Sequence, residues 1–133
     1  IFLCAKAAIP TLKRQRSGRI VNIGSMAGVS ALQLSSPPYA AAKAGVHSLT
    51  RVLALELGKH GVCANALAPG TTATERVVAV RNQEQREVIG KSTLVGRIAE
   101  VSDMVGWILL LAAPESGYLT GQTLSINGGR LMV

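Results

Sequence analysis

Tyr39 and Lys43 are the first pair in this chain whose types and spacing could do chemistry; they lie in the run SSPPYAAAKAG, residues 35–45. On a helix, residues four apart lie one above the other on the same face. The pKa of a free tyrosine is near ~10, and a nearby ammonium lowers it by favouring the phenolate. The pair could therefore serve as an acid/base at neutral pH. The same spacing also arises by chance in alanine-rich helices, so the pair alone is a weak signal.

Ser25 is the next candidate, because it ends the run RIVNIGS, which reads as a short buried strand. Open α/β sheets bind their ligands at the carboxyl ends of the strands. A hydroxyl at that position could hydrogen-bond a substrate carbonyl while Tyr39 donates or accepts its proton. The alternative is an ordinary turn serine that follows a glycine.

The elements that must position these residues alternate between helix and strand. Hydrophobic spacing and Gly/Pro signals predict helices over residues 1–16, 39–58, 75–89 and 100–113 and strands over 19–25, 62–68 and 121–129. We expect the last helix to be largely buried. This order is typical of an α/β fold, in which a parallel sheet is buried on both faces between helices.

The start of the chain suggests a fragment. It has no initiating Met and no capping residue, so we expect it to begin inside a helix. Three strands make a thin parallel sheet, and their apolar runs call for further strands that would be N-terminal.

Composition limits the class of protein. The chain has 133 residues, of which 48% are hydrophobic and 16% charged, which fits one domain or less and excludes disorder. No apolar run approaches the ~18 residues of a membrane span, and the opening apolar stretch precedes its basic residues, opposite to a signal peptide. Cys4 and Cys63 lie in apolar surroundings, so we expect buried, reduced thiols and a cytoplasmic location.

The net charge of +7 raises the question of a nucleic-acid partner. No aromatic residues are interleaved with the early basic residues to stack on bases, so a solvated helix end is favoured over a nucleic-acid patch. His47 and His60 have no partner at metal-ligand spacing and are interpreted as packing or solvated side chains, which predicts no metal site.

Taken in order, the motifs of the chain resemble the C-terminal half of the short-chain dehydrogenase/reductase family. The resemblance runs from the first residue to the last, and no single motif carries it. The motifs are Asn22-Ile23-Gly24-Ser25, Tyr39-x-x-x-Lys43, Asn65-Ala66-Leu67-Ala68-Pro69-Gly70, Thr120-Gly121-Gln122 and Asn127-Gly128-Gly129. The interval from Ser25 to Tyr39 is one residue longer than expected, within a Gly/Ser/Pro loop that tolerates length changes.

The resemblance implies a doubly wound Rossmann fold that uses NAD(H) or NADP(H), and it implies roles for matching residues. Ser25 would orient the substrate oxygen, and Tyr39 would be the acid/base. Lys43 would lower the tyrosine pKa and hold the nicotinamide ribose, so Tyr39 and Lys43 also belong to the cofactor site. The remaining cofactor-binding residues would be Pro69, Gly70, Thr72 and Thr74.

The family's glycine-rich phosphate turn and its catalytic asparagine have no counterpart here. Residues 1–133 are therefore expected to be a partial NAD(P)-binding Rossmann domain, with three strands and flanking helices, without its N-terminal nucleotide-binding half. We expect such a chain to be inactive alone.

Within the family, the runs GRIVNIGS, YAAAKAG and NGGRLMV are most similar to 3-oxoacyl-acyl-carrier-protein reductases. That similarity implies a carbonyl or alcohol substrate linked to an acyl carrier protein, docking at Arg16, Lys59 and His60, and a homodimer or homotetramer when complete. Sugar, polyol and steroid dehydrogenases share the core motifs and remain alternatives, as does a truncated, non-catalytic remnant. The substrate would be selected by residues 27–38 and 71–91.

Overall fold

The computed structural model describes residues 1–31 and 35–132 and contains one parallel sheet of three strands in the order β1-β2-β3. The strands are β1 (Gly18–Ile23), β2 (Val62–Pro69) and β3 (Thr123–Ile126). In the register, Ile23 pairs with Leu67 and Pro69 with Ile126. Because the strands are parallel, all three carboxyl ends meet at one edge of the sheet.

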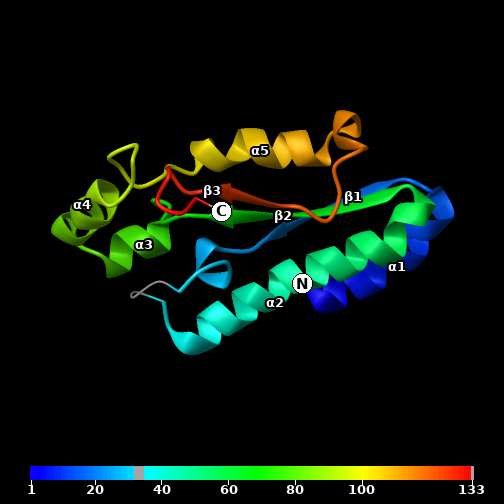
Figure 1. Cartoon of the computed structure of the whole chain (residues 1–133), viewed down its shortest axis with the longest axis horizontal. Coiled ribbons are helices and arrows are strands. Elements are labelled where there is room, and N and C mark those ends of the chain that lie inside the picture. Colours follow the sequence, from blue (N-terminus) through cyan, green and yellow to red (C-terminus); the bar gives the residue numbers. More distant parts are fainter. Residues whose placement is uncertain (32–34, 133) are drawn as a thin grey trace.

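Helices cover both faces of this sheet (Figure 1). Helices α1 (Phe2–Gln15) and α2 (Pro37–Leu57) lie on one face, and α5 (Ser102–Ala112) lies on the other. Helices α3 (Glu75–Val80) and α4 (Gln83–Lys91) lie beyond the carboxyl ends of the strands. This arrangement confirms the predicted α/β fold with a parallel sheet and flanking helices. The short 3-10 turns are η1 (Met26–Gly28), η2 (Gly58–His60) and η3 (Pro114–Ser116).

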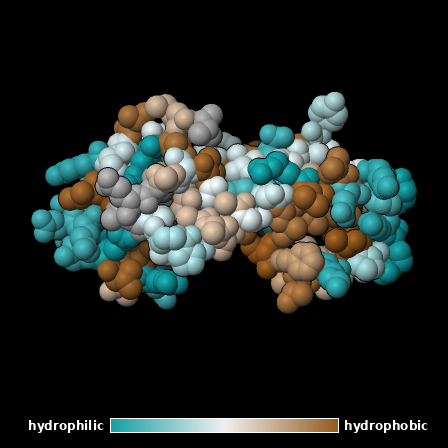
Figure 2. Space-filling model, turned by 60° about the horizontal axis from the view of Figure 1, so that its bottom comes forward, coloured by the Kyte–Doolittle hydropathy of each residue, from teal (hydrophilic) through white to brown (hydrophobic). Residues whose placement is uncertain are grey.

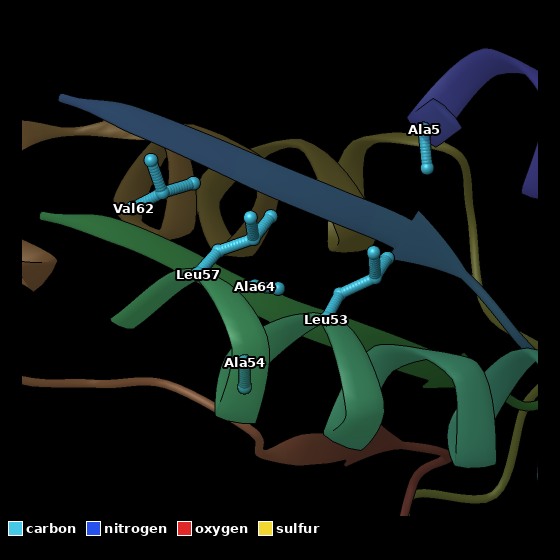
Figure 3. Close-up of a cluster of buried hydrophobic side chains, with 6 residues drawn as sticks. All are labelled: Ala5, Leu53, Ala54, Leu57, Val62 and Ala64. Carbon is cyan, nitrogen blue, oxygen red and sulfur yellow. The ribbon is translucent and has the colours of Figure 1, made fainter. Parts of the chain in front are cut away.

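The larger core cluster lies where α2 packs on β2 and α1 packs beside β1 (Figure 3). Its buried members are Ala5, Leu53, Ala54, Leu57, Val62 and Ala64. On the opposite face, α5 contributes Met104 and Leu111 to a second cluster with Leu67. Residues 62–68 of β2 are all buried, whereas most of β1 and β3 are only half-buried. The expectation of strands buried on both faces therefore holds for the central strand alone.

Helix α5 is far less buried than its sequence suggests. Met104 and Leu111 are buried, whereas Val105, Trp107 and Leu109 are exposed. One stripe of a helix is enough to cover a sheet, so the remaining apolar side chains face outward. The prediction of a largely buried helix was wrong.

The predicted helix over residues 75–89 is two helices. Asn82 caps the second one: its Oδ1 accepts the Gln85 N–H at 2.9 Å, and Gln85 Oε1 accepts the Asn82 N–H at 3.0 Å. This reciprocal capping box starts a new helix at Gln83 and ends the first at Val80.

The third strand is shorter than predicted. It ends at Ile126, and Gly128 and Gly129 follow with φ of 64° and 77°. This left-handed backbone cannot continue a strand and suits glycine.

Helix α2 begins at Pro37, two residues earlier than predicted, because proline is favoured in the first turn of a helix.

The two cysteines differ in burial. Cys63 is buried in β2, where its thiol donates to the Gly117 carbonyl at 3.4 Å, whereas Cys4 is exposed on α1. The expectation of two buried thiols was wrong for Cys4, because α1 buries only Ala5.

Among the described residues, no helix combines the length and hydropathy needed to cross a membrane.

Candidate active site

The candidate residues gather at the carboxyl edge of the sheet. Ser25 follows the end of β1, and the Gly24 N–H donates to the Leu67 carbonyl of β2 at 2.8 Å. Pro69 ends β2, and the Gly70 N–H donates to the Ile126 carbonyl of β3 at 2.9 Å. The segments after β1 and β2 are thus joined to neighbouring strands at one edge, as the sequence predicts for an open α/β sheet.

Ser25 caps the turn η1 at the end of β1. Its Oγ accepts the N–H of Ala27 at 3.2 Å. This bond occupies a lone pair and leaves the hydroxyl hydrogen free to donate to another group.

The η1 turn packs closely on α2. A Cβ atom added at Gly28 would overlap the α2 backbone at Lys43 and Ala44. A glycine is required at this contact, which holds the Ser25 segment at the level of Lys43.

Tyr39 lies in the first turn of α2 and is 47% exposed. The Lys43 Nζ lies 5.8 Å from the centre of the Tyr39 ring, within cation–π range. The same Nζ donates to the Ile23 carbonyl at the end of β1, at 2.9 Å. Lys43 therefore connects Tyr39 with the strand that leads to Ser25. Within residues 1–31 and 35–132, no hydrogen bond joins Ser25 directly to Tyr39.

His47, one turn beyond Lys43 on α2, is a contact of Ser25 that the sequence did not reveal. It is 3% exposed, and its Nε2 lies 3.0 Å from the Ser25 carbonyl oxygen. Its burial fits the interpretation of a packing histidine. The signal available in the sequence was its spacing of four residues from Lys43, which puts both on one helix face.

The residues predicted to bind cofactor after β2 have structural partners. Thr74 caps α3, where its Oγ1 accepts the Val77 N–H at 3.3 Å. The Thr72 hydroxyl donates to the Gly70 carbonyl at 3.3 Å. A Cβ added at Gly70 would lie 3.1 Å from the Asn127 Cα, so Gly70 packs tightly against the end of β3.

A pocket of about 200 Å³ opens beside Gly70. Gly70 and Thr71 line one part, Asn127 another, and Met104 and Trp107 of α5 a third. Of the predicted site residues only Gly70 lines it. This pocket is therefore distinct from the candidate catalytic site, because Ser25, Tyr39 and Lys43 do not line it.

Three residues predicted to dock a carrier protein lie together although the chain separates them. Arg16 Nη2 donates to the Lys59 carbonyl at 3.4 Å. Desolvation, followed by the charges of Lys13, Lys59 and Arg16, lowers the pKa of His60 below its ordinary value. Three positively charged side chains thus act on the His60 imidazole, and we call Lys13, Arg16, Lys59 and His60 the basic cluster. Lys13 was not among the residues predicted to dock the carrier.

Two segments were expected to select the substrate. Residues 71–91 contain α3 and α4, and residues 32–34 of the segment 27–38 lie outside the described residues.

In the described part of the chain, no three His, Cys, Asp or Glu side chains are grouped so that they could hold a metal ion.

Comparison with known proteins identifies relatives along the whole chain. Residues 1–130 match the family model described as enoyl-(acyl carrier protein) reductase. A 3-oxoacyl-[acyl-carrier-protein] reductase FabG of Vibrio harveyi is 37% identical over 133 residues, which are 100% of this chain and 54% of that protein. The chain thus spans about half the length of the curated relatives it matches.

Solved structures agree with this result. The crystal structure of a 3-oxoacyl-[acyl-carrier protein] reductase from Brucella melitensis matches with a TM-score of 0.93 and 34% identity, over 99% of this chain and 49% of that one. A further structure of such a reductase from Brucella melitensis, with bound NAD, matches with a TM-score of 0.87 and 32% identity, over 99% and 48%.

A gluconate 5-dehydrogenase from Burkholderia cenocepacia J2315, in complex with NADP and tartrate, matches with a TM-score of 0.85 and 32% identity, over 95% of this chain and 49% of that one.

The order of the motifs, the parallel sheet and these similarities lead to one conclusion. The chain belongs to the short-chain dehydrogenase/reductase family of oxidoreductases.

Proposed function

We propose that this chain is the C-terminal half of an NAD(P)-dependent oxidoreductase that interconverts a carbonyl and a secondary alcohol, most like a 3-oxoacyl-acyl-carrier-protein reductase. The observation that carries the proposal is the position of Lys43. Its Nζ lies 5.8 Å from the Tyr39 ring and 2.9 Å from the Ile23 carbonyl, two residues before Ser25.

Each of the three side chains has a chemical task in this proposal. The free hydroxyl hydrogen of Ser25 donates to the substrate oxygen and orients it. In reduction, the Tyr39 phenol donates its proton to that oxygen, and in oxidation it accepts the proton. The Lys43 ammonium stabilises the negative charge that develops on the phenol oxygen as the proton leaves.

A nicotinamide cofactor fits the polar groups that face this edge. An ammonium has three N–H donors, and Lys43 uses one at the Ile23 carbonyl, which leaves two for the hydroxyls of a ribose. Pro69, Gly70, Thr72 and Thr74 would line the continuation of that site. When bound, the cofactor supplies or accepts the hydride, and the protein supplies position and the proton.

Within residues 1–31 and 35–132, β1 has a partner strand on one side alone, which supports a larger sheet. β1 pairs with β2 on one side, and Ile23 is 43% exposed. We propose that residues 1–133 form a partial Rossmann domain and that an N-terminal half, as long as the part of the relatives not matched here, adds strands to this edge and completes the cofactor site. On this proposal the 133 residues alone do not turn over substrate.

The test uses the full-length protein that contains this chain, with ketone and alcohol substrates and a change in NAD(P)H absorbance as the readout. Tyr39→Phe keeps the ring and removes the proton, and should lower kcat by about 100-fold or more. Tyr118→Phe is the matched control, because Tyr118 is fully exposed outside the site, and its kcat should not change. Absence of turnover in the wild type, or full activity of Tyr39→Phe, would refute the proposal.

An acyl-carrier-linked substrate is supported by the basic cluster of Lys13, Arg16, Lys59 and His60. An acidic carrier would be attracted to this patch, mainly through its association rate. Arg16→Glu with Lys59→Glu should raise KM for an acyl-carrier-protein substrate and leave KM for the same acyl group on a small thiol unchanged. An equal effect on both substrates would contradict carrier docking.

Sugar acids are a second candidate substrate class, because a gluconate 5-dehydrogenase is among the similar structures. Gluconate and 5-ketogluconate therefore belong in the substrate panel. Higher kcat/KM for these than for 3-oxoacyl thioesters would favour the sugar-acid function.

We further propose that the complete protein forms a homodimer or homotetramer through α1 and α2. Figure 2 shows hydrophobic residues gathered on this face, over the half where α1 lies. The exposed apolar side chains here include Ile1, directly before α1, and Phe2, Leu3, Val52 and Leu55 of the two helices. Light scattering should give at least a dimer mass, and Leu55→Glu should reduce it. A monomeric wild type would contradict the proposal.

A further inference from the structure

We propose that His47 is a positioning residue that fixes the Ser25 backbone for catalysis, an inference that rests on the function proposed above. His47 is buried in α2, between the end of β1 and the start of β3. It has no part in the proton transfer assigned to Tyr39 and Lys43. Buried polar side chains generally have specific hydrogen-bond partners, and the partners of His47 are informative.

The partners of His47 determine its tautomer. The Ser25 carbonyl oxygen, 3.0 Å from Nε2, can only accept, so Nε2 carries the hydrogen. The Ser25 backbone nitrogen lies 3.5 Å from the same atom and then cannot donate to it. Nδ1 is left as an acceptor, and the Thr123 hydroxyl lies 3.4 Å away as its donor. A neutral imidazole with hydrogen on Nε2 satisfies both contacts.

The ring also contacts the residue before Ser25. A Cβ atom added at Gly24 would overlap the His47 Cε1 and crowd both ring nitrogens. The imidazole therefore fills the space that a side chain at Gly24 would need. Gly24 and His47 fit one another, and the turn after β1 is packed as well as hydrogen-bonded.

Together with Lys43, His47 restrains the carbonyls on both sides of Gly24. Lys43 Nζ donates to the Ile23 carbonyl at 2.9 Å, and His47 Nε2 donates to the Ser25 carbonyl at 3.0 Å. Both donors come from consecutive turns of α2. These two bonds fix the direction in which the Ser25 side chain leaves the backbone, and small displacements of such a group can lower a rate strongly.

The test uses His47→Leu and His47→Gln in the full-length protein. Leucine fills the space without hydrogen bonds, and should lower kcat by about 10-fold, because a displaced Ser25 hydroxyl stabilises the transition state less well. The KM for NAD(P)H should change by less than about twofold, because the cofactor groups stay in place. Glutamine can place its amide nitrogen near the position of Nε2 and should recover most of kcat.

A double-mutant cycle with Ser25→Ala separates positioning from a general structural role. If His47 acts through the Ser25 hydroxyl, His47→Leu should have little further effect once that hydroxyl is gone. Leu53→Ala is the structural control: it removes a buried side chain of α2 away from Ser25 and should lower Tm in both backgrounds without changing kcat. A loss of kcat by the same factor in both backgrounds would overturn the inference.

The tautomer gives a readout that does not require turnover. Long-range ¹H–¹⁵N NMR of the full-length protein should show hydrogen on Nε2 of His47, and hydrogen on Nδ1 alone would overturn the inference. A wild type without turnover refutes the proposed function and the positioning role of His47 with it. An active wild type in which His47→Leu keeps its kcat refutes only the role of His47.

Discussion

Replacing Asn65 should remove two of the hydrogen bonds that join β2 to the segment that leads into β3. Asn65 is fully buried in the middle of β2, where its Nδ2 donates to the Leu119 carbonyl at 2.8 Å and its Oδ1 accepts the Gln122 N–H at 3.0 Å. Asn65→Ala leaves both backbone groups without these partners. At about 1–3 kcal/mol for each unsatisfied group, the loss of unfolding free energy should be about 2–6 kcal/mol.

A second substitution at the same position tests the reasoning more sharply. Asn65→Asp keeps an acceptor for the Gln122 N–H but faces the Leu119 carbonyl with an oxygen. Burial raises the pKa of such a carboxyl, so the folded variant binds more protons than the unfolded chain. Its stability should therefore fall as pH rises above about 4. At low pH, the protonated acid can donate to the Leu119 carbonyl.

The measurement is urea unfolding of the full-length protein, followed by circular dichroism. With an m-value of about 2 kcal/mol per molar urea, a loss of about 3 kcal/mol lowers the midpoint by about 1.5 M. Gln122→Ala is the control, since the one hydrogen bond of its exposed side-chain amide within the described residues is to the Thr120 carbonyl, at 3.1 Å, and should cost less than about 0.5 kcal/mol. A cost below about 1 kcal/mol for Asn65→Ala, or a pH-independent Asn65→Asp, would refute the reasoning.

Three further predictions concern other parts of the molecule. Leu57→Ala, at a fully buried α2 position, should cost about 2–5 kcal/mol in urea unfolding because it leaves a cavity; a cost below about 1 kcal/mol would contradict this packing. Gly70→Ala should raise the KM for NAD(P)H, since its Cβ would lie 3.1 Å from the Asn127 Cα; Gly106→Ala, whose Cβ meets nothing within 4 Å, is the control and should leave it unchanged. The Arg97 side chain, followed by the Glu100 N–H, lowers the pKa of Asp103 to about 2, so its contribution to stability is present above the ordinary carboxyl pKa and is lost as pH falls towards about 2. Acid unfolding of Asp103→Asn should accordingly be flatter between about pH 4 and 2, and a profile identical to the wild type would count against this ion pair.

The order of helices and strands could be predicted from the sequence because each strand is a short apolar run bounded by glycine or proline. The extent to which α5 is buried could not be predicted, because an apolar run does not show which of its side chains contact the sheet. The break at Asn82 was readable in principle, because Asn82 and Gln85 have capping-box spacing. Helix-compatible residues on both sides concealed it.

In the candidate site, the spacing of Tyr39 and Lys43 correctly predicts one helix face. The hydrogen bond from Lys43 to the Ile23 carbonyl could not be predicted, because it depends on the packing of η1 against α2 at Gly28. The contact of His47 with Ser25 depends on the same packing. The basic cluster likewise forms because the end of α1 meets η2, a long-range contact.

The parallel sheet has a consequence for how this protein folds. No two of its strands are joined by a hairpin: β1 and β2 are separated by α2, and β2 and β3 by α3, α4 and α5. Every strand pair therefore requires closure of a long loop, which slows folding. β2 leaves the ribosome well before β3, so a nascent chain carries one unpaired edge of its most buried strand. We expect this interval to be when the chain is most exposed to aggregation and to chaperones.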